Sequence, residues 1–164
     1  MNEIFIRTSI RQFEDRKVEQ EKIEKILRAA MQSPTAGNQQ TWEFYVVENK
    51  ETLEKLSGTS PYASCTKNAP VAIVIAYRDG GRFEDYNEID CAIASENIWL
   101  EAEALGLGTV MLGIAPLKER MEAVEKVLEF PEDLHAFTIF PIGYPVQKNA
   151  QQDRFNPEKI HYVR

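Results

Sequence analysis

Three residues near the start of the chain have the types and spacing of an anion-binding site. Arg7, Ser9 and Arg11 stand at alternate positions of the segment RTSIR. In an extended chain, alternate side chains point to the same side, so these three would line one edge about 14 Å long, at ~3.4 Å per residue. Guanidinium groups pair bidentately with phosphate oxygens, and a serine hydroxyl adds a neutral hydrogen bond. The spacing therefore favours a phosphate-binding edge, and a solvent-exposed basic face is the alternative.

Side chains suited to nucleophilic or metal catalysis are scarce. No serine lies in a GxSxG motif, and His135 and His161 are the only histidines that could act as a base near neutral pH. His135 begins an apolar run and His161 lies near the end of the chain, so structural roles are favoured for both. Cys65 and Cys91 have no CxxC or metal-ligand spacing. This pattern predicts two packed free thiols and no metal site.

The common nucleotide-binding motifs are also missing. The segment GLGTVMLG has Met111 where GxGxxG requires its third glycine, and it joins a predicted helix to a strand instead of a strand to a helix. No GK[ST] sequence of a phosphate-binding P-loop occurs. A nucleotide would therefore be held in another way, and RTSIR is the candidate segment.

The composition is that of one globular domain spanning residues 1–164. Hydrophobic residues make up 43% of the chain, and 19 basic against 26 acidic residues give a net charge of −7. An acidic chain disfavours a nucleic-acid partner, which requires a basic face. No apolar run approaches the ~18 residues of a membrane span, and the first residues do not form a signal-peptide core. We therefore expect a cytoplasmic protein that binds neither nucleic acid nor membrane.

Hydrophobic spacing and turn residues indicate the elements that position these side chains. The longest is a central, mostly buried helix over 86–105, which is expected to end at Gly106 in the left-handed conformation. The strand over 71–77 is apolar enough to be covered on both faces. A proline is expected in the first turn of the last helix. The predicted helices are 18–32, 49–56, 86–105 and 116–129, and the predicted strands are 42–47, 71–77, 108–112 and 136–142.

The order of these elements favours an α+β fold of three layers, because strands and helices mix without a strict βαβ rhythm. Polar spacers and prolines near the end of the chain predict an extended tail, about 146–164. Phe155, Ile160 and Tyr162 in this tail need a surface to cover. A partner subunit is one natural candidate for that surface.

Taken together, four segments resemble the FMN-dependent nitroreductase family. They are RTSIRQF near the start, AMQSPTAGNQQTWEF after the first helix, ALGLGTVMLGIAP at the end of the long helix, and FPIGYP followed by DRF. They stand in the family's order and span essentially the whole chain, whose length fits the compact single-domain members. The resemblance implies a mixed, mainly antiparallel sheet flanked by helices, and a homodimer with FMN at the subunit interface.

The resemblance also implies a phosphate-binding group built from both ends of the chain. Arg7 and Ser9, with Thr8 between them, would hold the phosphate and ribityl end of FMN. Arg154 would complete this group. Gln152 departs from the pattern, because family members often have a second basic residue at that position. The departure bears on the strength of phosphate binding.

The flavin ring would be held by further residues that the resemblance implies. Arg11 would lie near the pyrimidine edge, where a fixed cation stabilises the negative charge of the reduced ring. The Gly113 amide would donate to flavin N5, and a glycine there permits close approach of the backbone. The remaining implied contacts are Pro34, Thr35, Ala36 and Asn38 from the other subunit, and Met111, Leu112 and Gly113 over the ring.

The implied activity is an NAD(P)H-dependent oxidoreductase. NAD(P)H would pass hydride to flavin N5, and an electron-poor acceptor such as a nitroaromatic or quinone would then be reduced in the same place, in ping-pong order. Because the flavin carries this chemistry, no catalytic side chain is predicted, which agrees with the shortage of histidine. Two alternatives remain open. One is a flavin-binding or flavin-delivering protein with little turnover, and the other is a specialised reaction such as reductive dehalogenation or flavin destruction.

Overall fold

A five-stranded antiparallel sheet forms the centre of the computed structural model, which describes residues 2–164. Its strands are β1 (Trp42–Val47), β2 (Val71–Arg78), β3 (Gly108–Thr109), β4 (Leu112–Gly113) and β5 (Leu134–Gly143). The order across the sheet is β1-β2-β5-β3, and β4 also pairs with β5. The sheet and its flanking helices confirm the predicted α+β class.

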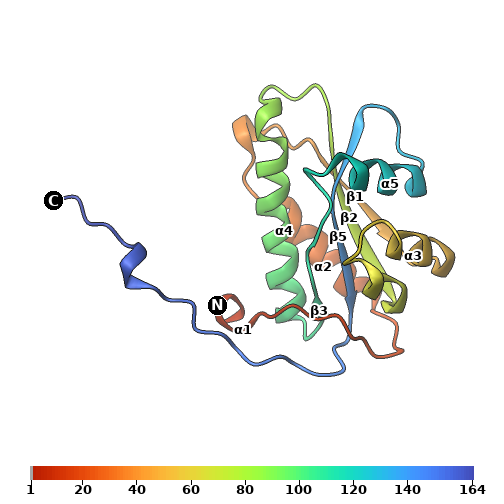
Figure 1. Cartoon of the computed structure of the whole chain (residues 1–164), viewed down its shortest axis with the longest axis horizontal. Helices are drawn as coiled ribbons and strands as arrows, with labels where there is room; N and C mark the ends of the chain where they lie inside the picture. Colours follow the sequence, from red (N-terminus) through yellow and green to blue (C-terminus); the bar gives the residue numbers. More distant parts are fainter. Residues whose placement is uncertain (1) are drawn as a thin grey trace.

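Helices cover both faces of the sheet and complete the three predicted layers (Figure 1). They are α2 (Gln20–Met31) and α4 (Asn87–Ala104) on one face, and α3 (Lys50–Ser57) and α5 (Lys118–Leu128) on the other. Strand β2 shows why both faces are covered, because its apolar side chains alternate between them. Ile73 and Ile75 pack with α2 and α4, whereas Ala72 and Val74 pack with α3 and α5. No helix of residues 2–164 has both the length and the apolarity to cross a membrane.

The long helix α4 ends as its sequence predicts. Gly106 follows it with a φ of 74°, which is the left-handed conformation. The Leu107 N–H donates to the Ala102 carbonyl (2.8 Å), and the Gly106 N–H donates to the Glu103 carbonyl (3.0 Å). These two bonds satisfy carbonyls that a helix end otherwise leaves unpaired. The turn directs the chain back to the sheet at β3.

The predicted strand over 108–112 is instead two short strands. Strands β3 and β4 continue in one register against β5 but are separated at residues 110–111. In that register Pro141 stands opposite the gap, and proline has no N–H to donate to a neighbouring strand. Its carbonyl accepts instead from the Thr109 hydroxyl (2.6 Å). The ladder is therefore interrupted where its donor is missing.

The start of helix α5 also differs from the prediction. The helix begins at Lys118, so the expectation of Pro116 in its first turn is wrong. Leu117 has an extended backbone and separates the proline from the first turn. Several very short elements carry too few residues to show a hydrophobic period and were not predicted. They are α1 (Glu3–Ile6) and the 3₁₀ turns η1 (Ala36–Asn38), η2 (Ser64–Asn68), η3 (Glu84–Tyr86) and η4 (Pro157–Lys159).

The tail leaves the body of the molecule as an extended segment (Figure 1). Its residues 146–164 are exposed, and the turn η4 is the one helical element in them. Phe155 and Tyr162 keep about three quarters of their surface exposed, at 75% and 76%. The packing of these aromatic side chains on a partner subunit stays a prediction.

The two cysteines are packed free thiols, as predicted. Cys65 and Cys91 are both buried and form no disulfide. Burial raises the pKa of both thiols, which keeps them protonated and unreactive near neutral pH. His135 lies 3.0 Å from an Asp79 carboxylate oxygen, and His161 is exposed in the tail. Neither histidine lines the cavity described below.

Candidate functional site

Five of the predicted binding residues, from opposite ends of the chain, line one cavity of about 820 Å³. They are Arg7, Thr8, Ser9, Arg11 and Arg154. The other lining residues come from α1 and from the tail, and Asp153 is the one acidic residue among them. Three guanidinium groups and one carboxylate make this cavity locally cationic in a chain of net charge −7. The arrangement suits an anionic ligand such as a phosphate ester.

Strand β3 holds the segment RTSIR in place. Ser9 forms a parallel bridge with Thr109, and the Ile10 N–H donates to the Thr109 carbonyl (2.9 Å). The Ile10 side chain is buried over Gly108, where an added Cβ atom would lie 2.7 Å from its Cγ2 atom. Successive residues of an extended segment face opposite sides. Burial of Ile10 therefore turns Ser9 and Arg11 away from the core and toward the cavity.

The tail forms the opposite wall of the cavity. Besides the hydrogen bond from the Val146 N–H to the Gln12 carbonyl (3.2 Å), two side-chain contacts attach it. Asn149 Nδ2 donates to the Ser9 carbonyl (2.7 Å). Lys148 Nζ lies 2.7 Å from Glu103 Oε1, a carboxylate that is largely buried at the end of α4. These contacts join the tail to the N-terminal segment and to the helical layer.

Gln152 contacts Arg154, which lies two positions later in the tail. Its Oε1 atom accepts hydrogen bonds from Arg154 Nε (3.3 Å) and Nη2 (2.9 Å). The position at which family members often have a second basic residue is therefore occupied by a side chain that orients the guanidinium. The cavity has one cation fewer than that pattern implies, but Arg154 lines it.

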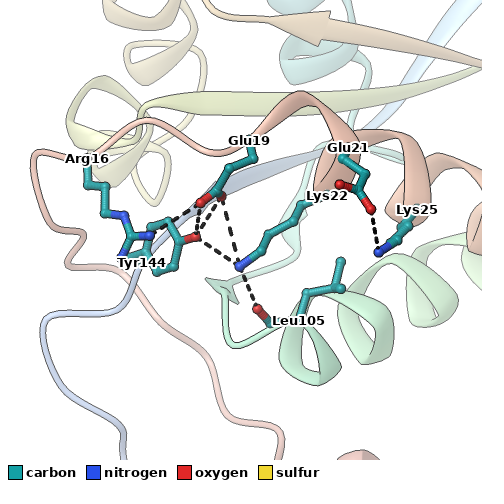
Figure 2. Close-up of polar contacts among 7 residues, drawn as sticks. All are labelled: Arg16, Glu19, Glu21, Lys22, Lys25, Leu105 and Tyr144. Carbon is teal, nitrogen blue, oxygen red and sulfur yellow. Dashed lines mark hydrogen bonds and ion pairs between the residues drawn. The ribbon is translucent and has the colours of Figure 1, made fainter.

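A cluster of side chains fixes the point at which the tail leaves β5 (Figure 2). Tyr144 donates from its hydroxyl to Glu19 Oε2 (2.6 Å) and accepts from Lys22 Nζ (2.9 Å). Lys22 Nζ also donates to the Leu105 carbonyl just after α4 (3.1 Å). The Arg16 guanidinium stacks 3.7 Å from the centre of the Tyr144 ring. This tyrosine cluster links α2, the end of α4 and the start of the tail.

The tyrosine cluster predicts an acid-sensitive contribution to stability. The hydrogen bond from Tyr144 is the main cause that lowers the pKa of Glu19 below its ordinary value of 4.5. A carboxylate with a lowered folded pKa stabilises the protein above its unfolded pKa, and this contribution is lost as pH falls through the folded value. We expect Tyr144→Phe to be less stable than wild type above pH 4.5, with the difference shrinking at lower pH.

Urea unfolding of both proteins between pH 3 and pH 7, at closely spaced values, measures this difference. Tyr162, which is 76% exposed in the tail, offers the control variant Tyr162→Phe, which should be as stable as wild type over the whole range. A Tyr144→Phe difference that is constant over the whole range would contradict the assignment to Glu19.

The loop 34–38 lies elsewhere in the chain, against the first half of α4. The Ala36 N–H donates to Asp90 Oδ1 (2.9 Å), and Gln39 Nε2 donates to Asp90 Oδ2 (2.7 Å). Gly37 and Asn38 both have positive φ, at 56° and 57°. Within one chain, the cavity that Arg7, Arg11 and Arg154 line has no lining residue from this loop. The loop residues in question are Pro34, Thr35, Ala36 and Asn38. Their contact with the flavin of the partner stays a prediction.

The segment 111–113 is also outside the cavity lining. Met111 packs against the core, and the Leu112 side chain is buried, so that Leu112 has only its backbone to offer a ligand. Gly113 is exposed, and an added Cβ atom there would have no neighbour within 4 Å. The roles of these three residues at the flavin ring stay predictions.

Sequence reasoning missed two residues that structure the cavity. Trp99 lies in the helix predicted over 86–105 to be mostly buried, where its spacing indicates core, yet the Arg7 guanidinium carbon lies 4.0 Å from the centre of its ring. Asn149 stands in a polar stretch with no periodicity. Asn97 on α4 is a polar residue of the buried helix whose Nδ2 donates to Ser33 Oγ (2.8 Å) and to the Ala29 carbonyl (3.1 Å), which gives it a structural role.

The protein-family comparison decides which family these features belong to. A model described as the nitroreductase family matches residues 4–60 and 58–144, which include the RTSIR segment and all five strands of the sheet. The chain belongs to the nitroreductase family. This membership confirms the resemblance of the four sequence segments, and it makes the protein an oxidoreductase of the nitroreductase type.

Relatives of this nitroreductase-family protein match nearly its full length. A protein of Archaeoglobus fulgidus, provisionally named an NADH dehydrogenase/NAD(P)H nitroreductase, is 42% identical over 96% of this chain and 94% of its own. The solved structure of a provisionally named NADH oxidase of Clostridium acetobutylicum is 44% identical, with a TM-score of 0.96 over 99% of both chains. An FMN-dependent nitroreductase of Clostridium difficile is 31% identical, with a TM-score of 0.92 over 99% of this chain and 98% of that one. These structures confirm the nitroreductase-like fold.

Proposed function

We propose that this nitroreductase-family protein is an FMN-dependent NAD(P)H oxidoreductase that reduces electron-poor acceptors such as nitroaromatics or quinones in ping-pong order. The observation that carries the proposal is the convergence of Arg7, Arg11 and Arg154 on one cavity. The names of relatives support the cofactor, because one is an FMN-dependent nitroreductase and another, in Bacillus subtilis, is an FMN reductase that uses NAD(P)H.

The residues that line the cavity fit the phosphate end of FMN. Arg7 and Arg154 offer paired N–H donors to a phosphate, and Ser9 adds a hydroxyl. FMN, when bound, supplies hydride acceptance and donation at its N5 atom, which no side chain of this protein offers. Arg11 would place positive charge at the pyrimidine edge and favour the negative charge that develops there. The Gly113 N–H would donate to N5.

A homodimer is the second part of the proposal, and exposed apolar residues support it. The side of α4 that faces away from the sheet exposes Ile89 and Ile93, and α1, which contacts α4, exposes Ile4 and Phe5. Large apolar side chains gathered on a surface indicate an interaction site. A second copy of the chain would cover this helical face, and its aromatic tail would pack across the partner.

The variant Ile93→Glu tests the dimer. We expect a charge in the middle of this helical face to convert a dimer at micromolar concentration into a monomer and to weaken FMN binding at least tenfold, because the proposed site needs both subunits. Sedimentation velocity and an FMN titration measure the two effects. The control Lys126→Glu changes charge on α5, on the opposite face of the sheet, and should leave both unchanged. A wild-type protein that is monomeric at this concentration would contradict the proposal.

An absorption spectrum and a steady-state assay test the activity. The proposal predicts a flavin spectrum after purification or after addition of FMN and removal of the excess. It also predicts NAD(P)H oxidation with menadione or a nitroaromatic well above the rate of free FMN. A protein that retains no FMN would refute the proposed function.

A second candidate function is a flavin-binding or flavin-delivering protein with little turnover. The observation that favours it is Gln152, which leaves the cavity with one cation fewer than the family pattern implies. The same assay separates the two functions. Retention of FMN with turnover no faster than free FMN would favour the binding protein.

A further inference from the structure

We propose that Trp99 is a positioning residue that holds the Arg7 guanidinium in place for the phosphate of the ligand. This inference rests on the proposed function, because it assigns a support to one of the cations in the proposed phosphate site. The Arg7 guanidinium carbon lies 4.0 Å from the centre of the Trp99 ring. At this distance the positive charge is attracted to the electron-rich face of the indole.

The stacking is the main fixed contact of the Arg7 side chain. Within residues 2–164 no carboxylate lies in ion-pair distance of Arg7. A carboxylate partner would compete with phosphate for the guanidinium N–H groups, whereas a ring under the guanidinium plane leaves those groups free at its edge. Trp99 therefore restrains the cation without using the donors that a phosphate needs.

The Trp99 ring is itself held by packing. It meets the Phe140 ring edge to face, with centroids 6.1 Å apart and planes at 75°. Phe140 is fully buried in β5. The Trp99 indole N–H is buried and finds no hydrogen-bond partner among the described residues, so packing sets its orientation. A rigid path thus runs from the core through Phe140 and Trp99 to Arg7 at the cavity.

Binding of FMN and of riboflavin, which lacks the phosphate, tests this role. We expect Trp99→Leu to weaken FMN binding by about threefold to thirtyfold, the range for loss of a cation–π contact. Riboflavin binding should change little, so the preference for FMN over riboflavin should fall by the same factor. A role in packing alone would weaken both ligands equally.

Trp42 offers a matched control. It is the other tryptophan of the chain and packs against the same core cluster as Trp99, but within residues 2–164 no guanidinium or ammonium group lies over its ring. Trp42→Leu should therefore leave the FMN preference unchanged. In an Arg7→Leu background, Trp99→Leu should cause no further loss of preference, because its target is gone. Should Trp99→Leu fail to fold, Trp99→Tyr and Trp99→Met give the same comparison, with the preference kept by tyrosine and lost with methionine.

The outcomes separate this inference from the proposed function. If wild-type protein binds FMN no more tightly than riboflavin, the cavity is not a phosphate site, and both the proposed phosphate contact and the role of Trp99 are refuted. Wild-type protein that prefers FMN, with a preference that Trp99→Leu or Trp99→Met leaves intact, would overturn the role of Trp99 alone.

Discussion

Replacement of Arg154 by alanine is expected to weaken FMN binding by about 1.5 to 3 kcal/mol, which is roughly tenfold to a hundredfold in Kd. The reason is the position of Arg154 in the cavity wall, opposite Arg7 and Arg11. A hydrogen bond to a charged group is worth more than one between neutral groups, and a guanidinium can donate two such bonds to one phosphate. Gln152 orients this guanidinium, so Gln152→Ala should produce a smaller loss in the same direction.

Fluorescence titration of apoprotein with FMN measures both Kd values. Arg164→Ala is the matched control, because Arg164 lies in the same tail, stacks near Tyr162 and does not line the cavity. An unchanged Kd in Arg154→Ala would remove Arg154 from the phosphate site. An equal loss in Arg164→Ala would instead indicate a general effect of tail charge.

Alanine substitutions of Gly108 and Gly113 are expected to have different effects. The first should lower stability, and the second should lower turnover. In Gly108→Ala the new methyl group would lie within 2.8 Å of three Ile10 side-chain atoms, close to the backbone of the RTSIR segment. Overpacking of this kind costs about 1 to 3 kcal/mol of stability and should loosen the segment from β3. In Gly113→Ala the methyl group meets nothing within 4 Å of the chain, so stability should be kept. Turnover should nevertheless fall roughly tenfold to a hundredfold, because the methyl group would displace the flavin from the proposed N5 contact.

Urea unfolding of the apoproteins and steady-state turnover separate the two effects. The expected pattern is a stability loss with weaker FMN binding in Gly108→Ala, and normal stability with impaired turnover in Gly113→Ala. Full activity in Gly113→Ala would refute close approach of the flavin at that position. Unchanged stability in Gly108→Ala would show that Ile10 can move without cost.

Much of the fold could be predicted because local signals agree with tertiary packing. The unbroken apolar run of β2 predicted cover on both faces, and Gly106 predicted the end of α4. The gap between β3 and β4 could not be predicted, because its cause is Pro141 on another strand. The sequence of residues 108–113 alone does not show that a proline on the paired strand will interrupt their hydrogen bonding.

In the candidate site, too, contacts within one segment could be predicted from the sequence, whereas contacts between distant segments could not. Alternation in RTSIR predicted a shared edge for Arg7, Ser9 and Arg11, and all three line one cavity together with Thr8. Arg154 required the family resemblance, because it lies at the other end of the chain. The contact of Trp99 with Arg7 is long-range and was invisible in the sequence, where a tryptophan at helical spacing indicates core.

The two walls of the cavity are also made at different times. Residues are translated in chain order, so the wall that carries Arg7 and Arg11 is made well before the wall that carries Arg154. The sheet and its helices can assemble on the nascent chain before the tail emerges, but the cavity cannot close around an anion until then. An anion can therefore be held between the two walls only after Arg154 has been translated and has left the ribosome.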